Sequence, residues 1–140
     1  MILVRSTIGL AIELVVLALL ISGYLVKRQH KYRQHGLIMF SALVLHIISI
    51  MLIMVPSFGA FFSDVSAVNF ADALVIAALI HVSAGVIAAL LGIWLVSSWH
   101  LQESVQTCFR KKHFMDITLV LWFLAISLGF ILYWVIVQTI

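Results

Sequence analysis

The sequence contains little charge and almost no cysteine or proline. Only 9% of its 140 residues are Asp, Glu, Lys or Arg, whereas an ordinary soluble protein has about 25%. A surface with so few charges would not keep a chain of this size dissolved in water, so a soluble domain is excluded. The single cysteine, Cys108, excludes an intramolecular disulfide and a metal site made only of cysteines.

Motifs of the common enzyme classes are also absent from the sequence. We find no phosphate-binding loop, no catalytic triad pattern and no paired-carboxylate motif. A c-type haem would need the motif C-x-x-C-H, which is missing as well. We therefore predict no catalytic residue, and we favour a subunit of a larger complex over a stand-alone enzyme.

Apolar residues, which make up 65% of the chain, form four long runs. A helix needs roughly 20 residues to cross a hydrocarbon core about 30 Å thick, so each run is long enough to span a bilayer. Short connections place successive helices antiparallel. The sequence therefore predicts one all-α domain over residues 1–140, an integral membrane four-helix bundle that runs up, down, up and down. The expected helices are residues 6–26, 35–56, 71–98 and 114–137.

The basic residues mark one side of the membrane. Seven of the eight Lys and Arg residues lie in residues 27–34 and 99–113, whereas the loop of residues 57–70 has none. By the positive-inside rule both basic loops are cytoplasmic and both termini lie outside, in a multi-pass protein of the cell membrane. Because the basic clusters lie beside apolar runs, we expect contact with the lipid bilayer and no nucleic-acid partner.

Two of the six histidines fall deep inside the expected spans, where polar residues are costly and mark function by default. His46 lies ten residues before Pro56, and His81 lies ten residues after Ala71. At about 1.5 Å per residue, both lie roughly 15 Å from the outer face. We expect the two imidazoles to face each other across the bundle.

A second pair is expected nearer the cytoplasmic face. His35 precedes His46 by eleven residues, which is almost three turns, so both share one helix face. Gly92 lies at the level of His35, and His113 can reach the same level from the start of the last helix. The glycines of the third helix, Gly85 and Gly92, either allow close helix approach or leave room for a flat ligand.

Paired imidazoles from facing helices are a common way to hold a b-type haem. We therefore predict haem b at His46 and His81, with a second haem at His35 and His113. Basic residues at the cytoplasmic ends of the helices are expected to pair with the propionates of this second haem. These are Lys31, Arg33, Arg110, Lys111 and Lys112.

Other interpretations of the polar residues stay open. A histidine in a membrane helix also serves as a hydrogen-bonding residue between helices. Copper is the alternative metal, because thioethers and imidazoles bind Cu(I), although methionine is also ordinary apolar filler. Glu13 suggests proton handling, quinone contact or pairing with Arg5. The methionines concerned are Met39, Met51, Met54 and Met115.

Three segments resemble a family of small four-helix membrane proteins. They are HGLIMFSALVLHIISIMLIMVPSFG from His35, LIHVSAGVIAALLGIWLVSSW from Leu79 and CFRKKHFMDITLVLWFLAISLGFILYW from Cys108. Over about residues 30–135 the chain resembles the family catalogued as domain of unknown function 420, which includes archaeal members and relatives linked to cytochrome oxidase assembly. Where many of those relatives have His-Arg, this chain has Lys112-His113-Phe114. The histidine arrangement also resembles that of di-haem b cytochromes.

The sequence thus favours a membrane-embedded b-type cytochrome subunit that carries electrons across or along the membrane in a respiratory or redox complex. Its expected partners are other membrane or extracytoplasmic redox subunits, with quinone as a further candidate. One alternative is a non-enzymatic assembly factor that handles haem or copper for a terminal oxidase. Another is a structural membrane subunit without a cofactor.

Overall fold

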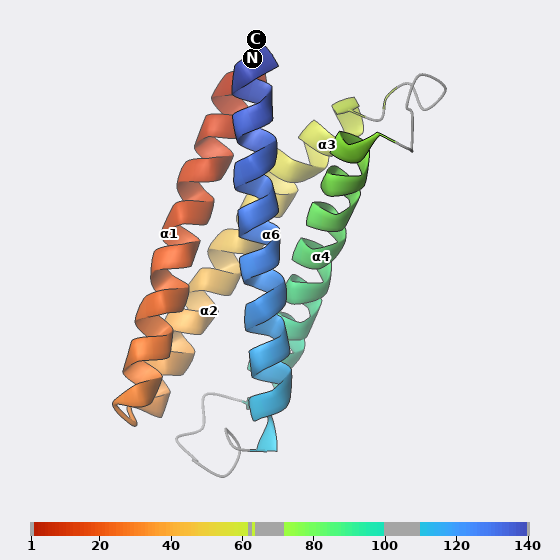
Figure 1. Ribbon diagram of the computed structural model, residues 1–140. Helices are drawn as coiled ribbons and strands as arrows, with labels where there is room; N and C mark the ends of the chain where they lie inside the picture. Colours follow the sequence, from red (N-terminus) through yellow and green to blue (C-terminus); the bar gives the residue numbers. More distant parts are fainter. Residues whose placement is uncertain (1, 62, 64–71, 100–109, 140) are drawn as a thin grey trace.

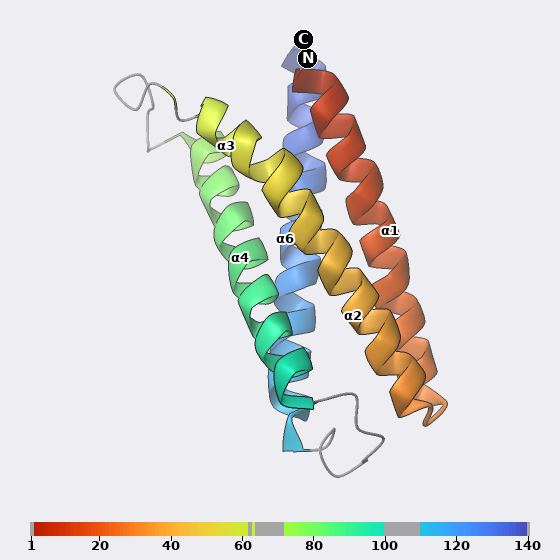
Figure 2. The ribbon, with the colours of Figure 1, turned by 180° about the vertical axis from the view of Figure 1, so that it is seen from behind.

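The computed structural model describes residues 2–61, 63, 72–99 and 110–139. His100 and Cys108 lie outside the described residues. The described chain forms long helices that run side by side, and both termini lie at one end of the bundle (Figures 1 and 2). The helical segments are α1 (Ile2–Arg28), α2 (Tyr32–Ser49), the π-helical η1 (Ile50–Met54), α3 (Val55–Phe61), α4 (Ala73–Trp99) and α6 (Lys112–Thr139).

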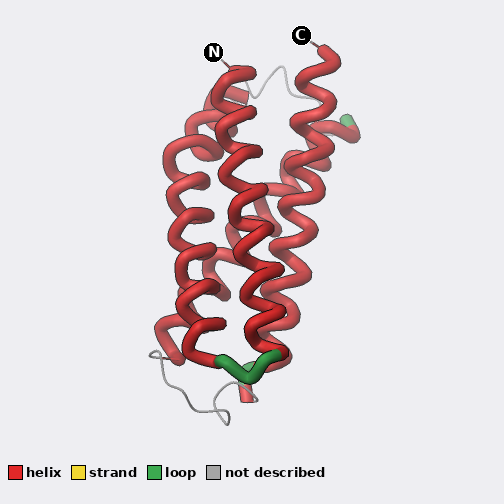
Figure 3. Tube along the Cα trace, turned by 90° about the vertical axis from the view of Figure 1, so that its left-hand side faces the viewer, coloured by secondary structure: helices red, strands yellow, loops and turns green. Residues whose placement is uncertain are grey.

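The predicted all-α membrane bundle is confirmed. Four helical stretches, with α2, η1 and α3 counted as one, are long and apolar enough to cross a bilayer, and the tube in Figure 3 shows them aligned along one axis. Leu52, Leu90 and Val120 are 71%, 60% and 66% exposed, whereas Ala42 and Ala88 are fully buried. Large apolar side chains outside and small ones inside are the arrangement of helices that pack in lipid.

The bundle is built from two helical hairpins. α1 packs along α2, and α4 packs along α6, while α2 and α4 make few contacts with each other. The first hairpin turns at His30, whose φ is 60°. The Lys31 N–H donates to the Val26 carbonyl and the His30 N–H to the Lys27 carbonyl, which is the Schellman pattern that ends helices. This tight turn sets α1 and α2 in register along their whole length.

The second membrane span continues past its predicted end. We expected the helix to stop at Pro56, but α3 extends to Phe61. A proline lacks an N–H and its ring presses on the carbonyl four residues earlier. In η1, which precedes it, the Val55 N–H donates to the Ile50 carbonyl five residues earlier. This wider π-helical turn accommodates the proline without breaking the span, and such turns are common at functional sites.

A buried apolar cluster joins the two hairpins. Residues from α1, α2, α4 and α6 contribute, and Trp122 of α6 is its largest member, at 3% exposure. The cluster lies between the two ends of the bundle, with polar side chains on either side of it. Its members are Val16, Leu20, Ala42, Leu43, Ala88, Trp122 and Ile126.

Gly36 is expected to be intolerant of any side chain. A Cβ atom at residue 36 would overlap the ring of Trp99, which packs directly on the Gly36 backbone. Gly36→Ala should lower the free energy of unfolding by about 1–3 kcal/mol, because overpacking forces a rigid ring to move. Thermal unfolding in detergent, followed by circular dichroism, measures the change. Gly59→Ala is the control, since a Cβ there has no neighbour within 4 Å; equal stability of the two variants would contradict the packing.

Candidate functional site

His46 forms the centre of the candidate site through a buried pair with Glu13. Its Nδ1 lies 3.1 Å from Oε1 and 3.2 Å from Oε2 of Glu13. His46 is 1% exposed and Glu13 is 6% exposed. Since a carboxylate can only accept, Nδ1–H is the donor, and in the neutral form of this imidazole the lone pair lies on Nε2.

The second ring nitrogen of His46 is buried and unpaired. Within the described chain, Nε2 of His46 has no hydrogen-bond partner. The ring of Trp122 packs on the imidazole, with 5.1 Å between ring centroids, and a Cβ on Gly85 would lie 3.9 Å from Nε2. A buried polar atom without a partner costs free energy, so this nitrogen calls for an explanation.

His81 has its Nδ1 fixed in the same manner. Nδ1–H donates to the backbone carbonyl of Ala125 on α6 at 2.7 Å, because a carbonyl oxygen can only accept. Gly129, one turn further along α6, makes room for the ring, since a Cβ there would lie 2.9 Å from Cε1 of His81. The lone pair of His81 is therefore on Nε2 as well.

One cavity brings His46 and His81 together, as the depth argument predicted. It measures about 260 Å³ and is mostly apolar, and it receives residues from every long helix. Gly85, predicted to leave room for a ligand, lines it. We call it the His46–His81 cavity. Its lining residues are Glu13, His46, Ile50, Met54, Val55, Phe58, Gly59, His81, Val82, Gly85, Val86, Ala125 and Ile126.

The donor atoms around this cavity suit some ligands better than others. In the part of the chain that the structure describes, no group of three or more His, Cys, Asp or Glu side chains is arranged to hold a metal ion. A haem needs only two axial ligands from the protein, because its own ring supplies four nitrogens to the iron. Met54 is the one thioether among the lining residues, whereas Met51 is 61% exposed.

His35 lies at the other end of the bundle, in a separate cavity of about 120 Å³. It is 5% exposed, and its Nδ1–H donates to the Gly23 carbonyl of α1 at 2.8 Å. Gly92 lines this cavity, at the level predicted from the spacing. We call it the His35 cavity.

The structure does not bring His113 to His35. His113 is exposed at the start of α6, where its ring contacts Phe114, and it is not among the residues that line the His35 cavity. Arg33 and Lys112 are also exposed and do not line the cavity. The basic residues that line it are Lys27 and Lys111. The arrangement therefore gives no support to a second haem held by His35 and His113.

Sequence reasoning missed the hydrogen-bond partners of His35, His46 and His81. Pairing of Glu13 with Arg5 was one of the interpretations left open, but Glu13 bonds His46 instead. The pairing of Glu13 with His46 could have been predicted from the sequence. Glu13 lies 17 residues before His30 and His46 lies 16 residues after it, so both have the same depth in the first hairpin. The hydrogen bonds to the carbonyls of Gly23 and Ala125 could not be predicted in this way, since every residue has a backbone carbonyl.

Comparison with known proteins found no matching family model, no matching curated protein and no matching solved structure. The resemblance to the uncharacterised four-helix family therefore stays a prediction from the sequence.

Proposed function

We propose that the protein is a membrane-embedded b-type cytochrome subunit that holds haem between His46 and His81. The observation that carries the proposal is the buried, unpaired Nε2 of His46 in the cavity that it shares with His81. A histidine that ligates a metal almost always donates its other ring N–H to a carboxylate or a carbonyl. Both histidines have this arrangement, through Glu13 and the Ala125 carbonyl.

The residues around the cavity fit a flat, bulky group. Gly85 lines the cavity beside Nε2 of His46, where a larger side chain would fill the space. α2 and α4, which carry the two histidines, make few contacts with each other, so little packing is lost when a ligand separates them. Trp122 adds an aromatic face beside His46. Haem-binding bundles likewise build their sites from side chains on facing helices.

The pairing of Glu13 also agrees with the proposal. A carboxyl group buried at membrane depth is costly unless it is paired. In the described residues the bonding partner of Glu13 is His46, through Nδ1. Haem ligation would use Nε2 and would leave this pair intact.

Each residue then has a defined task in electron transfer. His46 and His81 would hold the haem through Nε2, Glu13 and the Ala125 carbonyl would fix their tautomers and orientations, and the apolar wall would exclude water. A haem held by two imidazoles would supply electron-transfer chemistry without binding a substrate. Electrons would pass to or from other membrane or extracytoplasmic redox subunits of a respiratory or redox complex.

The orientation in the membrane is part of the proposal. The basic residues at the end of α1, the start of α2 and the start of α6 lie at the end opposite the termini. With the positive-inside rule this end is cytoplasmic, both termini are outside, and the His46–His81 cavity lies toward the outer face of the cell membrane.

Titration of the haem-free protein with haemin tests the proposal. The purified protein in lipid nanodiscs should bind about one equivalent, and the bound form should have the absorption spectrum of a low-spin haem with two imidazole ligands. The double variant His46→Ala, His81→Ala should lack this spectrum while keeping its helical circular dichroism. Absence of saturable binding, or the same spectrum in the double variant, would overturn the proposal.

Gly129→Ala should impair the site without removing a ligand. The new Cβ would lie 2.9 Å from Cε1 and 3.4 Å from Nδ1 of His81, so the ring must turn away from the Ala125 carbonyl. We expect haem affinity to fall about 10–100-fold, the usual effect of losing an outer hydrogen bond to a ligand. Gly36→Ala, at the other end of the bundle, should leave the affinity unchanged. An unchanged haem affinity in Gly129→Ala would contradict the role of the His81 orientation in holding haem.

One observation favours a second candidate, the assembly factor that handles copper for a terminal oxidase. Met54 lines the same cavity as His46 and His81, and thioether and imidazole ligands together suit Cu(I). Titration with Cu(I) distinguishes the candidates, because only a copper site should be weakened by Met54→Leu.

A further inference from the structure

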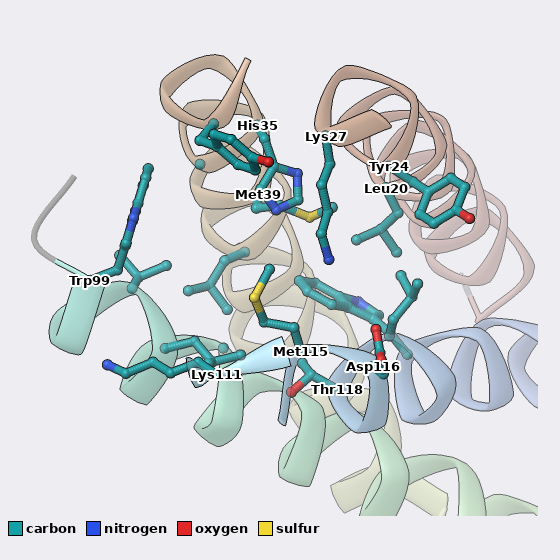
Figure 4. Close-up of a pocket in the computed structure, with 18 residues that line it drawn as sticks. Leu20, Tyr24, Lys27, His35, Met39, Trp99, Lys111, Met115, Asp116 and Thr118 are labelled. Atoms are coloured by element: carbon teal, nitrogen blue, oxygen red, sulfur yellow. The ribbon is translucent and has the colours of Figure 1, made fainter. Parts of the chain in front are cut away.

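The His35 cavity is a second site, at the end of the bundle opposite the termini. All four long helices contribute to it, and the close-up in Figure 4 shows the side chains of Lys27, His35 and Asp116 around it. Its volume is about 120 Å³.

The polar groups of this cavity offer both a donor and an acceptor. The Nδ1–H of His35 donates to the Gly23 carbonyl, so Nε2 carries a lone pair that can accept a hydrogen bond. Lys27 brings an ammonium group that can donate, and its side chain reaches from α1 into the cavity (Figure 4). Asp116 of α6 adds a second acceptor, and its charge opposes that of Lys27. Lys111 also lines the cavity, but its Nζ lies over the ring of Trp94, 5.2 Å from the ring centroid. With Lys111 held there, a neutral ligand with oxygen atoms suits the balance of Lys27 and Asp116 better than an anion does.

The remaining walls of the cavity are flat or easily deformed. Trp99 packs on the Gly36 backbone at one side, and Trp122 lies at the other. The thioethers of Met39 and Met115 also line the cavity, and such side chains adapt to a ring and contact its edge favourably. A pocket with apolar walls and a few convergent polar groups is the usual form of a small-molecule site.

We propose that the His35 cavity binds the ring headgroup of a membrane quinone or quinol. The Lys27 ammonium would donate to a ring carbonyl oxygen, and Nε2 of His35 would accept from the hydroxyl of the reduced form. The headgroup is neutral in both states, and its apolar tail would extend into lipid between the helices. An anionic lipid headgroup fits less well, because the carboxylate of Asp116 also lines the cavity.

Trp122 is close to both cavities. Its indole lines the His35 cavity, and its ring lies 5.1 Å from that of His46, which lines the other cavity.

The quinone site goes beyond the proposed haem function and does not depend on it, because none of its lining residues is a proposed haem ligand. Its binding can therefore be measured on haem-free protein.

Binding of a short-tailed ubiquinone to haem-free protein tests the proposal. In nanodiscs of phosphatidylcholine, the quinone should quench tryptophan fluorescence with saturation at about one equivalent per chain. Lys27→Met should weaken this binding at least tenfold. Lys31→Met removes the same charge from an exposed residue of the nearby turn and should leave binding unchanged.

Three outcomes would overturn the quinone site. The first is quenching no greater than in nanodiscs that hold an unrelated membrane protein, which indicates partition into lipid only. The second is equal affinity in Lys27→Met and Lys31→Met, provided that both keep their helical circular dichroism. The third is displacement of the quinone by phosphatidylglycerol with the same dependence on Lys27, which assigns the cavity to an anionic lipid. All three measurements use haem-free protein, so they can be interpreted even if the protein does not bind haem.

Discussion

Replacing His81 with alanine should abolish the low-spin haem spectrum and weaken haem binding by more than 100-fold. Loss of an outer hydrogen bond to a ligand already costs about 10–100-fold in metal affinity, and loss of the ligand itself should cost more. His81 is the informative ligand to remove, because its Nδ1 bonds only a backbone carbonyl and the change leaves no buried charge behind. Haemin titration and the absorption spectrum measure the effect.

His113→Ala is the matched control for this change. His113 also lies on a membrane helix, but it is exposed and contacts Phe114, away from both cavities. We expect this variant to bind haem as the unaltered protein does. If His113→Ala lost the haem and His81→Ala retained it, the assignment of the ligands would be wrong.

Replacing Glu13 with alanine should harm both the fold and the site. The Nδ1–H of His46 would lose its acceptor in a buried place, and an unsatisfied buried donor costs about 1–3 kcal/mol of stability. The tautomer and orientation of His46 would no longer be fixed, so haem affinity should fall about 10–100-fold as well. Thermal unfolding and haemin titration of the same preparation measure the two effects.

The conservative variant Glu13→Gln separates charge from hydrogen bonding. Its amide oxygen can still accept from Nδ1 of His46, so haem should bind with little loss. The midpoint potential should rise, because removal of a nearby negative charge destabilises the ferric state relative to the ferrous state. Asp116→Asn removes a carboxylate from the other end of the bundle and should leave the potential unchanged. A potential that did not move in Glu13→Gln would contradict a charged Glu13 bonded to a haem ligand.

The sequence predicted the bundle well because lipid imposes a simple rule. Each apolar run had to be a helix of about membrane length, and the observed spans differ from the predicted ones mainly by a few residues at their ends. The shared cavity of His46 and His81 followed from depth, since both lie ten residues from a helix end that the sequence predicted on the same side. Depth is readable from the sequence as soon as the ends of the helices are known.

Rotation about each helix axis was harder to predict. Glu13 and His46 have equal depth, but whether they face each other depends on how α1 and α2 pack around the turn at His30. The same uncertainty explains His113, which can reach the level of His35 but lies on an exposed face of α6. Four apolar helices carry little periodic pattern to mark their inner faces, so packing of small residues decides the rotation.

The continuation of the second span past Pro56 could not be read from the sequence either. A proline ordinarily predicts the end of a helix, and only the π-helical turn of η1 allows the chain to continue to Phe61. This turn begins four residues after His46 and brings Met54 and Phe58 to the cavity wall. The rule that a proline ends a helix failed in a segment that lines the candidate site, and such failures are common at functional sites.

The most direct test of the account is the reduced-minus-oxidised absorption spectrum of the protein purified from membranes of haem-producing cells. If His46 and His81 hold haem b, the spectrum should have an α band at about 560 nm, as two axial imidazoles give for low-spin iron. The band should correspond to one haem per chain, since the structure brings one pair of histidines together in a cavity within the described residues. A colourless, metal-free protein would contradict the account.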